Sequence, residues 1–211
     1  MKTEALIRAM AADTAPARPI GPLLAGAVLA LMAAGAAVYL SLFGMRPDFG
    51  AAMTQAAVMI KQASPLLLLV GGFGAALRLA HPGERVGGWA LVLLAMPALL
   101  ALAVAHSMMT MPRPDWHAAM MGSSSRRCLA WIIAMGLPFL AGVLWVLRAG
   151  ASTRPALTGA AGGLLAGGAA AVVYSMHCTE DSPLFYSVWY VIAMLAIALV
   201  GAVVGSRVLR W

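Results

Sequence analysis

Charged residues are scarce in this sequence. Of its 211 residues, 10% are charged and 63% are hydrophobic, whereas a soluble domain averages ~25% charged and ~45–50% apolar residues. Such a chain has too little polar surface to cover a water-soluble core, and its apolar content also excludes disorder. The apolar residues form long runs rather than short alternating strands. The sequence therefore predicts a helical integral membrane protein.

Catalytic motifs are also lacking. The chain contains no GxSxG or HExxH motif, no phosphate-binding loop and no dinucleotide fingerprint in a suitable context. Transporters and proton pumps usually carry ionisable residues at mid-membrane depth, and none lies near the centre of the apolar runs. We therefore expect neither enzymatic activity nor a bound cofactor.

Six charge-free stretches define the predicted spans. They extend over residues 19–45, 62–77, 86–112, 128–147, 155–179 and 182–206. A membrane-spanning helix needs ~17–25 apolar residues, so five of the stretches are long enough. The second is short, and we expect Lys61 and Arg78 to extend their charged ends to the two membrane interfaces. The predicted fold is an all-α bundle of six transmembrane helices.

Basic residues outnumber acidic ones by 14 to 7, which gives a net charge of +7. They are scattered between the apolar runs rather than clustered, so we expect no direct contact with nucleic acid. With the N-terminus inside, nine basic residues lie on the cytoplasmic side and five on the other. The positive-inside rule then favours two cytoplasmic termini, although the pair Arg126 and Arg127 opposes this orientation.

Glycines recur at four-residue spacing in the last two predicted spans. Gly159, Gly163 and Gly167 lie in the fifth span, and Gly201 and Gly205 lie in the sixth. Small residues at this spacing let helix backbones approach closely within a membrane. The pattern predicts a packing face within the bundle or, alternatively, a homodimer interface.

The two cysteines lie at equivalent ends of neighbouring spans. Cys128 begins the fourth span and Cys178 ends the fifth, and alternating helix direction places both on one face, which is periplasmic if the termini are cytoplasmic. Three hypotheses remain open: two packed thiols, a structural disulfide, or a sensor that is oxidised or binds metal. The candidate metal ligands are Cys128, Cys178, His177 and His117, but they show no CxxC or HxxxH spacing.

Residues 3–13 are predicted to form a short amphipathic helix, with Leu6, Ile7 and Met10 on one side. A helix of this length is marginally stable alone. It can lie on the membrane surface or present its apolar face to a cytosolic partner. We accordingly divide the chain into a cytoplasmic tail, residues 1–20, and a transmembrane domain, residues 21–211.

Several segments resemble the NrsF family, the membrane-bound negative regulators of extracytoplasmic-function sigma factors. These segments are MKTEALI at 1–7 with Asp13 and Pro16, Cys128-Leu129, the glycine-rich stretch 155–171, YSMHCTED at 174–181 followed by Phe185, Trp189 and Tyr190, and GSRVLRW at 205–211. The resemblance extends over essentially the whole chain, and the motif from Tyr174 to Tyr190 with the terminal Leu-Arg-Trp is its most specific part.

The resemblance implies a multi-pass anti-sigma factor of the bacterial inner membrane. Its cytosolic tail would hold a sigma factor away from RNA polymerase, and its periplasmic cysteines would sense metal or oxidative stress. The expected contacts to the sigma factor are Leu6, Ile7, Met10, Arg8 and Asp13, and the expected sensing residues are Cys128, Cys178 and His177. The alternatives are a small membrane thiol-redox or metal-handling protein and a structural membrane subunit. The expected partners are the sigma factor and the lipid bilayer, with a homodimer as the alternative that the glycine pattern leaves open.

Overall fold

The computed structural model describes residues 3–12 and 19–210, and within these ranges it contains helices and no strands. The long helices are α2 (Ile20–Phe43), α4 (Ala56–Leu79), α5 (Trp89–Thr110), α7 (Ser125–Leu147), α8 (Pro155–Ser175) and α9 (Pro183–Val208). The short ones are α1 (Thr3–Ala12), α3 (Phe49–Ala52), the 3₁₀ turn η1 (Arg113–Asp115) and α6 (Trp116–Met121). The six long helices are long and apolar enough to cross a membrane. The predicted six-span, all-α fold is therefore confirmed.

Proline and glycine set several helix ends. Pro155 and Pro183 lie in the first turn of α8 and α9, where the missing amide hydrogen costs nothing. Gly44 follows α2 with φ 76° and Gly122 follows α6 with φ 53°. Glycine adopts these positive φ angles readily, so the chain can leave each helix in a sharp turn.

The second span differs from its prediction. Helix α4 begins at Ala56, so Lys61 lies inside the helix and its side chain is fully buried. The ammonium group of Lys61 does not reach solvent, because it lies buried and pairs with Asp181 in the segment that connects α8 to α9. Arg78 is half-exposed at the other end of α4 and pairs with Glu84. A charge that is neutralised inside the bundle does not mark the end of a span.

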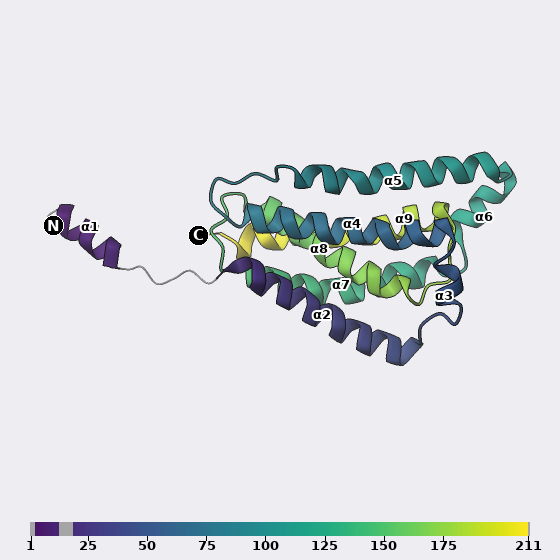
Figure 1. The fold of residues 1–211 in the computed structure, drawn as a ribbon, viewed down its shortest axis with the longest axis horizontal. Helices are drawn as coiled ribbons and strands as arrows, with labels where there is room; N and C mark the ends of the chain where they lie inside the picture. The colour runs from purple at the N-terminus through teal and green to yellow at the C-terminus, as the bar shows by residue number, and fades with distance from the viewer. Residues whose placement is uncertain (1–2, 13–18, 211) are drawn as a thin grey trace.

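Helix α8 occupies the middle of the bundle. It packs against α4, α7 and α9, and 15 of its 21 residues are buried. In α2, by contrast, only three of 24 residues are buried. Figure 1 shows α5 along one edge of the bundle and α2 along the other, with α2 diverging from its neighbours toward its C-terminal end.

The loops divide between two ends of the bundle. The first residue of α2 and the last turn of α9 lie at one end, which we call the terminal end (Figure 1). Residues 44–55, 111–124 and 176–182 connect the helices at the opposite end, which we call the distal rim. This division follows from the even number of spans.

The repeated glycines lie between α8 and α9. Gly159 packs directly against the backbone of Gly201 and Gly205. A methyl group added at Gly163 would lie 2.5 Å from the Cα atom of Ala198, and one at Gly167 would lie 3.1 Å from the Cα atom of Met194. Backbone contact this close leaves no room for larger side chains, so the two helices are held at a fixed separation.

Candidate functional site

The segment connecting α8 to α9, residues 176–182, carries an unbroken run of polar side chains at the distal rim. It includes His177, Cys178, Glu180 and Asp181. Cys178 is 3% exposed and Cys128, in the first turn of α7, is 0% exposed. Both cysteines are free thiols. The rim therefore combines two buried sulfur atoms with a loop rich in charge.

Asp181 is the centre of a buried ion-pair network. Its carboxylate accepts hydrogen bonds from Nη1 and Nη2 of Arg46, at 2.7 and 2.8 Å, and from Nζ of Lys61, at 3.0 Å. Arg46 also donates two hydrogen bonds to Asp48, at 2.8 and 2.9 Å. The side chains of Arg46 and Lys61 are 4% and 0% exposed. Two buried cations are thus neutralised by two carboxylates.

The same two cations fix the backbone at Cys178. Lys61 Nζ donates to the carbonyl oxygen of Cys178 at 2.6 Å, and Arg46 Nη1 donates to it at 3.3 Å. The backbone amide of Arg46 donates to the carbonyl oxygen of Met176 at 3.1 Å. These bonds join the loop to α4 and to the segment after α2, so the position of Cys178 depends on three parts of the chain.

The network shifts the pKa values of Asp181, Asp48 and Arg46. Burial of Asp181 raises the pKa of its carboxyl group, but hydrogen bonds from Arg46 and the charge of Lys61 outweigh burial and hold that pKa below its usual value. The hydrogen bonds from Arg46 lower the pKa of Asp48 as well. The hydrogen bonds to Asp48 and Asp181 raise the pKa of Arg46. Both carboxylates, Asp48 and Asp181, are therefore ionised at neutral pH.

Glu180 connects the loop to the start of α7. One of its carboxylate oxygens accepts hydrogen bonds from the backbone amide of Ser123, at 2.8 Å, and from the Ser123 hydroxyl, at 2.6 Å. Burial raises the pKa of Glu180, and the bonds from Ser123 outweigh it, so the pKa is lowered. Because Cys128 lies five residues after Ser123, this contact links the segments that carry the two cysteines.

An aromatic cluster lies beside the loop. His177 Nδ1 lies 2.9 Å from the carbonyl oxygen of Gly44, and its ring meets Tyr39 edge-on at 5.6 Å between centroids. Tyr39 also contacts Trp131, at 5.6 Å, and Tyr174, at 5.9 Å. These contacts connect the ends of α2, α7 and α8 and hold His177 in a fixed orientation.

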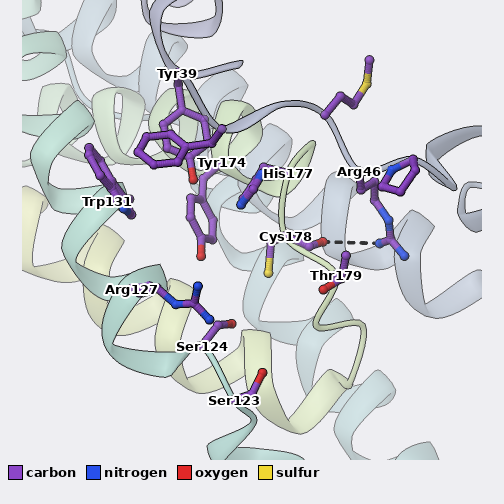
Figure 2. Close-up of a pocket in the computed structure, with 13 residues that line it drawn as sticks. Tyr39, Arg46, Ser123, Ser124, Arg127, Trp131, Tyr174, His177, Cys178 and Thr179 are labelled. Atoms are coloured by element: carbon purple, nitrogen blue, oxygen red, sulfur yellow. Dashed lines mark hydrogen bonds between the residues drawn. The ribbon is translucent and has the colours of Figure 1, made fainter. Parts of the chain in front are cut away.

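A cavity of about 300 Å³ opens among these residues (Figure 2). Its lining is Tyr39, Phe43, Met45, Arg46, Pro47, Ser123, Ser124, Arg127, Trp131, Tyr174, His177, Cys178 and Thr179. In Figure 2 the Arg127 guanidinium group is directed toward Tyr174 and Cys178. We call this space the rim cavity. Cys178 is part of its lining, whereas Cys128 is not.

The predicted metal ligands do not come together. His117 is exposed on α6, and nowhere in residues 3–12 and 19–210 do three or more His, Cys, Asp or Glu side chains form a group that could hold a metal ion. Cys128, Cys178 and His177 do lie at the same rim.

The predicted N-terminal helix forms α1. Its Ile7 side chain is 60% exposed, and Arg8 lies 3.9 Å from Glu4 with both side chains in solvent. Asp13 lies outside the described residues, as do the side chains of Leu6 and Met10. Of the expected contacts to a partner, the structure thus places Ile7 and Arg8 on an accessible surface.

Sequence reasoning missed the ion-pair network. The sequence pattern predicts Arg46 to be a topology marker and Lys61 to be an interfacial residue, whereas each is buried and bonded to Asp181. One feature of the sequence indicates the buried position of Lys61. It directly precedes the charge-free stretch 62–77, which is too short to span a membrane unless the helix extends past Lys61. A buried lysine in such a place requires a carboxylate partner.

Comparison with known proteins gives a full-length match. The family described as NrsF, negative regulator of sigma F, matches residues 9–211. The anti-sigma-F factor NrsF of Caulobacter vibrioides (strain NA1000 / CB15N) is 37% identical over 217 residues, and the probable anti-sigma-F factor NrsF of Azospira oryzae is 35% identical over 214 residues. Both alignments cover all of this chain and all of the relative. No solved structure matches the chain.

Proposed function

The chain belongs to the NrsF family of negative regulators of sigma F, and on this basis we propose that it is a membrane-bound anti-sigma factor. It sequesters an extracytoplasmic-function sigma factor at the cytoplasmic side of the bacterial inner membrane and releases it when a stress signal reaches the periplasmic side. The names of the two full-length relatives support the anti-sigma role. Six helices that can cross a membrane support the location.

The proposed orientation puts the terminal end in the cytoplasm. Six arginines at that end are exposed: Arg78, Arg85, Arg148, Arg154, Arg207 and Arg210. Exposed basic residues beside membrane spans favour the cytoplasmic side. The tail, residues 1–20, then extends into the cytoplasm, residues 21–211 form the membrane domain, and the distal rim faces the periplasm.

We place the contact to the sigma factor on α1. This helix has 10 residues, too few to be stable without a partner, and it exposes the apolar side chain of Ile7. If α1 docks in a groove of the sigma factor, the groove covers Ile7 together with Leu6 and Met10. Amphipathic helices bury their apolar faces in this way in other complexes. Arg8 and Asp13 would supply polar contacts around that apolar face.

The proposed sensor is the pair Cys128 and Cys178, with His177 beside it. The observation that supports the proposed sensor is the position of α8. This helix is buried along its length and ends two residues before His177. At its other end the hydroxyl of Thr158 donates to the carbonyl oxygen of Leu79, at 3.2 Å, in the last turn of α4. Oxidation or metal binding at the buried thiols would need new space at the rim, and a shift of α8 would carry that change to the terminal end. A coupling of ~1–3 kcal/mol between the two sites suffices for release.

Co-purification tests the binding part of the proposal. The full chain, solubilised from membranes, should retain a sigma factor, and deletion of residues 2–15 should abolish its recovery. Ile7→Glu should have the same effect, because it puts a charge into the apolar contact. Ala5→Glu is the matched control, since Ala5 is exposed on the opposite side of α1 and the variant carries the same added charge. Equal recovery with Ile7→Glu and Ala5→Glu would contradict the assignment of this face.

A second experiment tests the sensor separately. In cells, replacement of both cysteines, Cys128→Ser with Cys178→Ser, should leave the sigma factor bound and abolish its release under metal or oxidative stress. The reason is that serine preserves the size of the side chain and removes thiol chemistry. A normal stress response in the double variant would overturn the sensor, while the anti-sigma role would stand on the co-purification result.

A further inference from the structure

A second hollow adjoins the rim cavity within the membrane span. It is an apolar groove of about 350 Å³ between α2 and α7, and it shares Tyr39, Phe43 and Trp131 with the rim cavity. Its other walls are aliphatic side chains, glycine and proline of the same two helices, with Leu31 and Phe139 at its far end. The groove exists because α2 diverges from the bundle toward the rim (Figure 1). The polar cavity and the apolar groove therefore adjoin each other across one aromatic wall, in which the three shared rings contact one another.

The length of the groove corresponds to one membrane leaflet. On α2 its lining extends from Leu31 to Phe43, a separation of twelve positions, or ~18 Å at 1.5 Å per residue. One half of a bilayer's hydrocarbon core is ~15 Å thick. An acyl chain whose headgroup lies at the rim can therefore occupy the groove through the whole leaflet.

The rim cavity carries a positive charge without a counter-ion. Arg127 lines it, and no acidic side chain in the part of the chain that the structure describes lies within 4.0 Å of the Arg127 guanidinium group. Arg46 also lines the cavity, but Asp48 and Asp181 already bind it. Neither Asp nor Glu is among the residues that line the cavity. Its charge therefore suits a negatively charged group.

From these features we propose that the two hollows form a binding site for one glycerophospholipid of the distal leaflet. Its phosphate pairs with Arg127, and one acyl chain fills the groove between α2 and α7. The aromatic rings of Tyr39, Phe43 and Trp131 surround the glycerol region, at the level where aromatic side chains favour the membrane interface. The phosphate supplies the charge-assisted hydrogen bonds that Arg127 lacks, and the acyl chain covers the apolar walls.

Lipid titration followed by native mass spectrometry tests the phosphate contact. The solubilised full chain should bind a first phosphatidylglycerol molecule with higher affinity than any further phosphatidylglycerol molecule. Arg127→Gln should weaken this first binding event at least about tenfold, because a hydrogen bond to a charged group contributes ~1.5–3 kcal/mol and ~1.4 kcal/mol corresponds to a factor of ten. Arg126→Gln is the matched control, since Arg126 is the exposed neighbour on α7 that does not line the cavity. Equal affinities of the two variants would overturn the proposal.

A second pair of variants tests the acyl chain. Ala134 lines the groove and is exposed, so Ala134→Phe should fill the groove and weaken phosphatidylglycerol binding. Ala105→Phe, on an exposed position of α5, should leave binding unchanged. Inorganic phosphate distinguishes a lipid from a small anion. If inorganic phosphate binds as tightly as phosphatidylglycerol and Ala134→Phe has no effect, the site takes small anions and the lipid proposal is overturned.

Discussion

Removal of the Asp181 charge should destabilise the protein more than any other single change in the ion-pair network. Asp181→Asn leaves Arg46 paired with Asp48, but within residues 3–12 and 19–210 it leaves Lys61, whose side chain is 0% exposed, without a carboxylate partner. Breaking a buried ion pair at one partner costs roughly 3–5 kcal/mol, because the other charge stays buried without compensation. For a chain of this size this corresponds to a fall in unfolding temperature of about 10 °C.

Thermal unfolding of the detergent-solubilised protein, followed by tryptophan fluorescence at a fixed heating rate, measures this effect. Asp48→Asn is the control, because Asp48 is 54% exposed and bonds only to Arg46, so its loss should shift the unfolding temperature far less. Lys61→Met added to Asp181→Asn should recover much of the loss, since it removes the stranded charge. The reasoning is refuted if Asp181→Asn is no worse than Asp48→Asn, or if Lys61→Met gives no recovery.

Two further predictions concern pH and helix packing. The pKa of Asp181 is lowered in the folded protein, so its stabilising charge is fully present above the ordinary aspartate pKa of ~3.9 and is lost as the pH falls through the lower folded value. The unfolding temperature of the wild type should fall across that acidic range, and Asp181→Asn should flatten the fall. Gly163→Ala should destabilise the contact between α8 and α9 by ~1–3 kcal/mol through overpacking, because the added carbon would lie 2.5 Å from the Cα atom of Ala198. Gly26→Ala, where an added carbon meets nothing within 4 Å, should not lower the unfolding temperature, and an equal loss in both variants would contradict the packing argument.

The sequence was sufficient for the number of spans and for much of their placement. Charge is costly inside a membrane, so uninterrupted apolar runs had to correspond to helices, and an even number of them placed both ends of the membrane domain together. The same alternation brought Cys128 and Cys178 to one rim. Four-residue glycine spacing also indicated close helix contact, and Gly159 indeed packs against Gly201 and Gly205.

The interior of the rim was beyond what one sequence can show. Lys61 interrupts an apolar stretch, but its partner Asp181 is 120 positions away, and no local pattern joins the two. The rim cavity likewise depends on the angle at which α2 leaves the bundle, which is set by packing rather than by the composition of α2. Local patterns define helices and faces, whereas buried ion pairs and cavities arise from contacts between distant segments.

The anti-sigma role is tested most directly by the transcript level of promoters that depend on the sigma factor, in unstressed cells that lack this chain. If the chain holds the sigma factor inactive, these promoters should be active without any stress, and expression of the wild-type chain should silence them again. A chain with Ile7→Glu should fail to silence them, whereas one with Ala5→Glu should succeed. Promoters that stay silent in unstressed cells without the chain would contradict the account.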